Sequence, residues 1–193
     1  MTELTNSIVL AAQRGDQVAC QAIVEALHRP IIATIFRFLG TGHRREIEDL
    51  AQEVFLKVFR AIDKFDPSRA KFTTWVYTFV RNHCYDVLKR RRLPTTSMHA
   101  GKPDEPARDF EDRRELLPTQ EAENAELGRR IGEALATLGE DQRMVFVLRE
   151  YESLEYREIA EITGVNEGTV KSRLFRAKES LRQQLAPYLK AGA

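Results

Sequence analysis

The sequence is poor in cysteine and has no clustered metal ligands. Its two cysteines, Cys20 and Cys84, cannot form a disulfide framework, and neither has a second Cys or a His at zinc-binding spacing. The four histidines are scattered along the chain. We therefore expect no metal site, no cofactor and no catalytic residues, and two reduced thiols in apolar surroundings.

Long apolar runs are also missing. No stretch approaches the roughly 20 apolar residues that a membrane-spanning helix needs. The N-terminus, MTELTNSIVL, lacks the basic start and long apolar region of an export signal. With 42% hydrophobic and 31% charged residues, the composition is typical of a soluble globular protein. We expect a cytoplasmic protein without membrane insertion.

Strand-like alternation of apolar and polar residues is a third absence. Apolar residues instead recur at steps of three and four in several segments. This pattern predicts an all-α fold. A length of 193 residues suits two small helical domains better than one, so we expect two modest cores.

An acidic, proline-bearing segment separates the two helical parts. Residues 93–121 hold 7 acidic and 4 basic residues and four of the seven prolines. Such a composition is typical of an extended, flexible linker. We therefore divide the chain into a first domain at residues 1–92, a flexible acidic linker at 93–121 and a second domain at 122–193.

The most informative stretch, residues 153–178, joins two helical patterns across a glycine turn, which is the layout of a helix-turn-helix. Ser153 and Asn166 are suited to cap the two helices, and Gly164 to make the turn. The outer face of the second helix is basic, and an arginine can bond a guanine edge through two donors. This face carries Lys171, Arg173, Arg176 and Lys178. The pattern indicates DNA binding, and the alternative is a solvated face on an ordinary helical hairpin.

A helix predicted from residue 47 to residue 62 has one apolar and one polar face. Leu56 interrupts the polar face, beside Asp49, Gln52 and Glu53. An apolar side chain within a polar rim suits a protein–protein contact. The alternative for Asp49 is a simple favourable interaction with the helix dipole.

A helix predicted from residue 72 to about residue 91 has a basic C-terminal half. Part of this charge complements the negative end of the helix dipole. The dipole does not explain Asn82 and Tyr85, whose amide and ring suit a base edge and an unpaired base. Phe65, in a basic loop before this helix, is a candidate for holding a base flipped out of the duplex.

Three motifs together resemble the extracytoplasmic-function (ECF) sigma factors of bacterial RNA polymerase. They are DLAQEVF at 49–55, FTTW at 72–75 followed by Arg81-Asn82, and GTVKSRL at 168–174. The resemblance covers nearly the whole chain. It implies a sigma-2 domain in front, a sigma-4 domain behind and no intact domain between them. It also implies a sigma factor that directs core RNA polymerase to specific promoters and assists promoter melting, responds to stress and is controlled by an anti-sigma factor.

The resemblance further implies three contact surfaces. Core polymerase would bind Asp49, Gln52, Glu53 and Leu56. The minus-ten promoter element would contact Phe65, Arg81, Asn82, Tyr85 and Lys89. The minus-thirty-five element would contact Thr169, Lys171, Ser172, Arg173 and Arg176. The acidic linker would thread the polymerase channel near the RNA exit.

Two other classes of protein match parts of the sequence. A transcription regulator with this helix-turn-helix would carry a sensor or receiver domain in front, but the front part lacks a receiver's alternating strands and helices. An enzyme acting on nucleic acid would need clustered acids or a nucleophile–base pair, and neither occurs. Co-purification with core RNA polymerase, followed by run-off transcription, separates the three classes.

Overall fold

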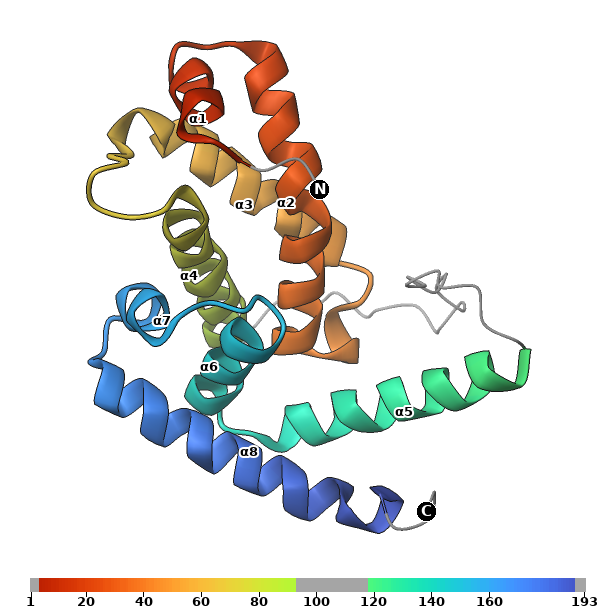
Figure 1. The fold of residues 1–193 in the computed structure, drawn as a ribbon. Coiled ribbons are helices and arrows are strands. Elements are labelled where there is room, and N and C mark those ends of the chain that lie inside the picture. Colours follow the sequence, from red (N-terminus) through yellow and green to blue (C-terminus); the bar gives the residue numbers. More distant parts are fainter. Residues whose placement is uncertain (1–3, 93–117, 190–193) are drawn as a thin grey trace.

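The computed structural model describes residues 4–92 and 118–189, and all regular structure in these ranges is helical, as predicted. The helices are α1 (Asn6–Gln13), α2 (Gln17–Leu39), α3 (Ile47–Ala61), α4 (Phe72–Arg92), α5 (Pro118–Thr137), α6 (Glu140–Glu150), α7 (Tyr156–Thr163) and α8 (Glu167–Leu189), with short 3-10 turns η1 (Thr41–His43) and η2 (Ile62–Lys64). We call α1–α4 the front group and α5–α8 the rear group (Figure 1). Helix α5 begins inside the segment assigned to the linker, whose residues 93–117 lie outside the described ranges.

Capping chemistry sets the start of α2. The carboxylate of Asp16 accepts hydrogen bonds from the backbone N–H groups of Val18 and Ala19 at 2.8 and 3.1 Å. Gly15, just before it, has a φ of 84°, a conformation that side chains with a Cβ rarely adopt. The helix continues through Pro30.

Helix α2 is also the one helix in the described ranges that is long and apolar enough to cross a bilayer, although the sequence analysis expected no such segment. Length and composition are weak evidence, because the core helix of a soluble protein passes the same test. Ile23, Ile31, Ile35 and Phe38 of α2 have no exposed surface and form the centre of the front group. Burying each such side chain contributes roughly 1.5–3 kcal/mol.

Helices α7 and α8 form the predicted helix-turn-helix. Gly164 ends α7 with a φ of 69°, and Asn166 caps α8 by accepting a hydrogen bond from the N–H of Thr169 at 2.8 Å. Ser153 does not cap α7. A capping box does so instead, in which Glu158 accepts from the N–H of Glu155 at 2.8 Å.

The two groups do not form the separate cores that we expected. Buried apolar side chains of α1–α4 and of α6–α8 make one continuous cluster, and a smaller cluster joins α5 to α8. Helix α7 packs on α4, and α6 packs on α2 (Figure 1). Thr74 of α4 shows the consequence, because this polar residue is only 2% exposed. The rear group covers a face of α4 that the sequence presents as polar.

Candidate nucleic-acid and polymerase interface

The polar face of α3 presents the four residues expected to contact polymerase. Asp49, Gln52 and Glu53 are exposed, and Leu56 is 56% exposed. Their spacing places them on one side of the helix, opposite its buried face. An exposed leucine with a polar rim is the arrangement that a reversible protein interface uses.

His83 connects this face to α4. Its Nε2 lies 3.5 Å from the Glu53 carboxylate, and its Nδ1 lies 2.7 Å from the Lys57 ammonium. Burial and the charge of Lys57 lower the pKa of His83, and the charge of Glu53 only partly offsets them. The imidazole is therefore neutral at pH 7 and accepts a hydrogen bond from Lys57.

The basic half of α4 brings together four of the five residues expected to contact the minus-ten element. Asn82 and Lys89 are exposed, whereas Arg81 and Tyr85 are half-buried. The Arg81 guanidinium lies 4.6 Å from the centre of the Tyr85 ring and donates a hydrogen bond to the Asn82 side-chain oxygen at 2.9 Å. A cation, an amide and an aromatic ring are thus held as one cluster before any ligand is present.

Tyr85 is not a free stacking face in this conformation. Its ring packs on Phe38, with 5.3 Å between centroids, and its hydroxyl donates to Asp141 of α6 at 2.7 Å. Burial and the hydrogen bond to Asp141 raise the pKa of Tyr85 well above its ordinary value, so the hydroxyl stays a donor. The rear group closes over this end of the α4 surface.

Phe65 lies in the core rather than exposed in a loop. It is 5% exposed, and its ring centroid is 5.1 Å from Phe72 and 5.4 Å from Trp75. Gln13 holds the chain here by donating to the carbonyl oxygens of Ile62 and Phe65 at 2.9 and 2.8 Å. The ring therefore cannot stack on a base in this conformation, whereas residues 66–69 of the loop are exposed.

The outward side of α8 carries the five residues expected to contact the minus-thirty-five element. Two hydroxyls are occupied locally: Thr169 bonds the Asn166 side-chain oxygen at 3.0 Å, and Ser172 donates to the Thr169 carbonyl at 2.9 Å. Lys171 and Arg176 are exposed, and Arg173 pairs with Asp141. This surface offers cations and small polar groups along one side of a helix that can enter a major groove.

Phe175 is a candidate that our sequence analysis missed. It is 71% exposed and stands between Arg173 and Arg176 in sequence. The spacing of apolar residues could have predicted its exposure. The buried stripe of α8 includes Val170 and Leu174, and Phe175 lies outside that stripe. An apolar side chain on a recognition helix can contact the methyl group of thymine.

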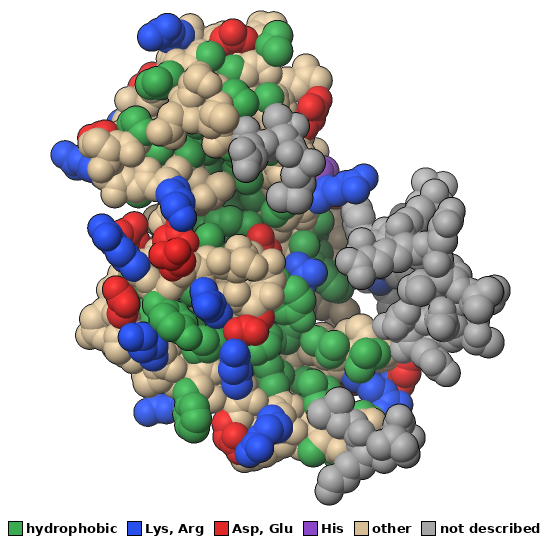
Figure 2. Space-filling model, viewed as in Figure 1, with side chains coloured by type: hydrophobic (Ala, Val, Ile, Leu, Met, Phe, Trp, Pro, Cys, Tyr) green, Lys and Arg blue, Asp and Glu red, His purple; other side chains and the backbone are tan. Residues whose placement is uncertain are grey.

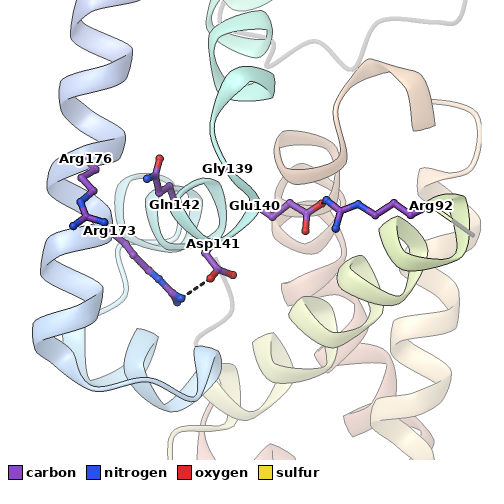
Figure 3. A pocket seen from close by; sticks show the side chains of 7 residues that line it. All are labelled: Arg92, Gly139, Glu140, Asp141, Gln142, Arg173 and Arg176. Carbon is purple, nitrogen blue, oxygen red and sulfur yellow. Dashed lines mark hydrogen bonds and ion pairs between the residues drawn. The ribbon is translucent and has the colours of Figure 1, made fainter.

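The α4 and α8 surfaces meet at a cleft of about 470 Å³ (Figure 3). Its lining comes from the C-terminal end of α4, the start of α6 and the outward side of α8: Arg92, Gly139, Glu140, Asp141, Gln142, Arg173 and Arg176. Arg92 pairs with Glu140 and Arg173 with Asp141, whereas Arg176 has no carboxylate partner among the described residues. Within the described ranges, no group of three or more Cys, His, Asp or Glu side chains could hold a metal ion.

Two family models match the chain, one in each helical group. The model for Sigma-70 region 2 matches residues 23–93, which span most of α2 through α4. The model for Sigma-70 region 4 matches residues 128–181, which run from α5 into α8.

Named relatives match over almost the full length. The ECF RNA polymerase sigma-E factor of Escherichia coli (strain K12) is 32% identical over 195 residues, covering 97% of this chain and 98% of the relative. The RNA polymerase sigma-H factor of Pseudomonas aeruginosa is 34% identical over 196 residues, covering 97% of each.

Two solved structures share the fold. CnrH in complex with the cytosolic domain of CnrY has a TM-score of 0.67 at 24% identity, covering 99% of this chain and 100% of that one. The sigma factor RpoE in complex with the anti-sigma factor NepR from Bartonella quintana has a TM-score of 0.64 at 23% identity, covering 86% and 96%.

Proposed function

The chain belongs to the ECF sigma factors, which direct core RNA polymerase to promoters, and from that premise we propose how its surfaces divide this task. Residues 1–92 bind core polymerase and the minus-ten element, and residues 122–193 bind the minus-thirty-five element. Residues 93–121 join the two domains. The observation that carries the proposal is that each matched region exposes residues of the expected chemistry: the polar face of α3 with Asn82 and Lys89 of α4 in front, and Lys171 and Arg176 of α8 behind.

Helix α8 enters the major groove of the minus-thirty-five element. Arg176 is exposed and has no carboxylate partner among the described residues, so it can bond a guanine edge or a phosphate without first losing a salt bridge. Phe175 beside it supplies an apolar contact. Lys171 contributes charge to phosphates, which raises affinity without choosing a sequence.

Helix α4 holds the unpaired minus-ten strand as the duplex melts. Asn82 offers a donor and an acceptor to a base edge, and Arg81 and Lys89 neutralise phosphates. Tyr85 becomes a stacking face once Asp141 releases it. We assign Phe65 a supporting role, in which its buried ring fixes the loop and the exposed residues 66–69 face the DNA.

Leu56 is the centre of the surface that docks on core polymerase. Asp49, Gln52 and Glu53 form its polar rim. The contact between Glu53 and His83 places this surface directly behind the promoter-facing part of α4. Binding of polymerase and positioning of α4 are therefore structurally linked.

We further propose that the protein acts by binding, without catalysis of its own, in the cytoplasm where polymerase and promoter DNA meet. RpoE, which shares this fold, is held by an anti-sigma factor. A partner of the same kind would control this chain in response to stress. If that partner is anchored in the membrane, it would hold the sigma factor nearby.

Run-off transcription tests the proposal. The protein is added to core polymerase on pooled genomic fragments, and transcript 5′ ends are sequenced. Defined start sites that depend on the added protein are expected. A regulator without sigma activity would leave core polymerase unable to choose start sites, and that outcome would contradict the proposal.

A further inference from the structure

Carboxylates of the rear group bond residues along α4, and one of them holds Tyr85 of the surface that the proposed function assigns to DNA. Four of them each bond a different part of the front group: Glu158, Glu152, Asp141 and Glu140, in order along α4. We call these four side chains the acidic row. Figure 2 shows acidic and basic side chains side by side over the region where α4, α6 and α7 meet.

Glu158 forms the first end of the row. It accepts a hydrogen bond from the Thr74 hydroxyl at 3.1 Å and pairs with the Lys71 ammonium at 3.1 Å. Burial acts to raise the pKa of Glu158, but bonds from the Glu155 N–H, Lys71 and Thr74 outweigh it and lower that pKa. The carboxylate is therefore charged at neutral pH.

Glu152 occupies the next position, between α2 and α4. It accepts from the Thr34 hydroxyl at 2.7 Å and from the hydroxyl of Tyr77. Tyr77 is buried, and burial together with the charge of Glu152 raises the pKa of Tyr77 far above its ordinary value. This contact is a part-buried, charge-assisted bond between the two groups.

Asp141 and Glu140 complete the row at the cleft of Figure 3. One oxygen of Asp141 accepts from Tyr85 and the other from Arg173, while Glu140 pairs with Arg92. Asp141 therefore holds one residue of the minus-ten surface and one of the minus-thirty-five surface at the same time.

The donors run from Lys71 to Arg92, which is about 30 Å along a helix. A DNA strand lying on α4 would bring its own row of negative charges to the same hydroxyl and cationic groups. Two anionic rows cannot occupy one face together. We infer that the acidic row is an internal competitor for promoter DNA. In the free protein it occupies the α4 face, and the rear group must move off α4 before the minus-ten strand can bind.

This inference rests on the proposed role of α4 and has a quantitative consequence. The apparent DNA affinity of the free protein is its intrinsic affinity multiplied by the fraction of molecules that are open. Neutralising the row should raise that fraction. The glutamine and asparagine replacements keep the shape of each side chain and a hydrogen-bond acceptor at each position.

The test compares two full-length variants with equal charge change. The row variant carries Glu140→Gln, Asp141→Asn, Glu152→Gln and Glu158→Gln. The control carries Glu25→Gln, Glu133→Gln, Glu161→Gln and Glu179→Gln, whose bonds stay within their own helices. The probe is a fluorescent oligothymidylate of about 12 nucleotides, because stacking and phosphate contacts need no particular sequence. Binding by the row variant should be about tenfold tighter than by the control. Equal affinities would overturn the inference.

A second measurement uses the unchanged protein. Carbodiimide should join Lys71 to Glu158, which are in contact, and the purified cross-linked species should lose oligothymidylate binding. Retention of full binding would overturn the inference. Run-off transcription with wild-type holoenzyme separates the two claims: absence of start-site selection defeats the proposed function, whereas normal selection with equal oligothymidylate affinities defeats only the internal competitor.

Discussion

Arg143 is a buried cation that donates hydrogen bonds to three backbone carbonyls. Its guanidinium donates to Phe38 at 2.7 Å and to Ala136 and Leu138 at 2.6 and 2.9 Å. These carbonyls lie at the ends of α2 and α5, where a helix leaves carbonyl groups without partners. Burial lowers the pKa of Arg143, and the negative ends of the two helix dipoles favour its charge.

Replacing Arg143 with methionine should therefore lower the free energy of unfolding by about 2–4 kcal/mol, because two buried carbonyls and one partly buried carbonyl lose their donor. Urea denaturation followed by circular dichroism measures the change. Arg143→Lys should recover little of it, since one ammonium group cannot reach all three carbonyls. A loss below about 0.5 kcal/mol would show that water replaces the guanidinium.

Phe175 should contribute to sequence choice through thymine. Once run-off transcription has identified the minus-thirty-five sequence, Phe175→Ala should weaken binding by about 1 kcal/mol, and replacing the contacted thymine with uracil should cost a similar amount. The two changes should not add, because both remove the same methyl contact. Fluorescence anisotropy on short duplexes measures all four combinations. Additive losses would place Phe175 elsewhere on the DNA.

Lys171→Ala supplies the comparison for a residue that we propose contacts only phosphate. It should weaken binding on every sequence alike and reduce the salt dependence by about one phosphate contact.

At the scale of the element, α3 offers the cleanest separation of function from stability. Leu56→Asp should lower affinity for core polymerase by about 2 kcal/mol or more if this side chain is the centre of the contact. The free energy of unfolding should change by less than about 0.5 kcal/mol, because the side chain is mostly exposed. Val18→Asp is the matched control, since Val18 is 77% exposed on α2. Equal effects of the two substitutions on polymerase binding would contradict the assignment.

Helix α4 shows which structural features could be predicted from the sequence and which could not. Its limits and its buried apolar stripe follow from spacing alone, as do the cations near its C-terminus. Periodicity identifies the residues of a face but not the element that covers it. The burial of Thr74 and the bond from Tyr85 to Asp141 depend on partners 84 and 56 residues away, which no local pattern contains.

Phe65 illustrates the same limit within a loop. The surrounding residues are basic and polar, so composition favoured an exposed ring. The side-chain direction is decided by Gln13, which bonds the loop backbone from 52 residues away, and by the aromatic cluster around Trp75. Phe175 is the reverse case, because its exposure could have been predicted from its place outside the buried stripe of α8.

For the whole molecule, the positions of the charged side chains in the fold matter more than their numbers in each sequence segment. Residues 122–193 hold 12 acidic and 11 basic residues, so their net charge is nearly zero. In the folded chain, cations dominate the outward side of α8, whereas the acidic row faces α4. The rear group therefore has a basic surface on α8 and an acidic surface toward α4, although the net charge of residues 122–193 is nearly zero.

Acid should open the molecule. Because hydrogen bonds lower the pKa of Glu158 below its ordinary value of 4.5, its contribution to closure is complete above that value and is lost as the pH falls through the lower, folded pKa. Small-angle X-ray scattering should show expansion below pH 4.5, while far-ultraviolet circular dichroism still reports helix. Glu158→Gln should be expanded at neutral pH and should respond less to acid. Expansion at the same pH in both proteins would assign the effect to another carboxylate.

One carboxylate, Asp141, is shared by Tyr85 and Arg173. We expect DNA that binds Arg173 to shift Asp141 and helix α6 with it, which would release Tyr85, and such a coupling between two binding events is reciprocal. The two promoter elements should therefore be bound cooperatively even when they lie on separate DNA fragments. DNA that carries only one of the two elements would have to open the molecule without the binding energy of the second element. Isolated single elements elsewhere in a genome should therefore bind the protein weakly.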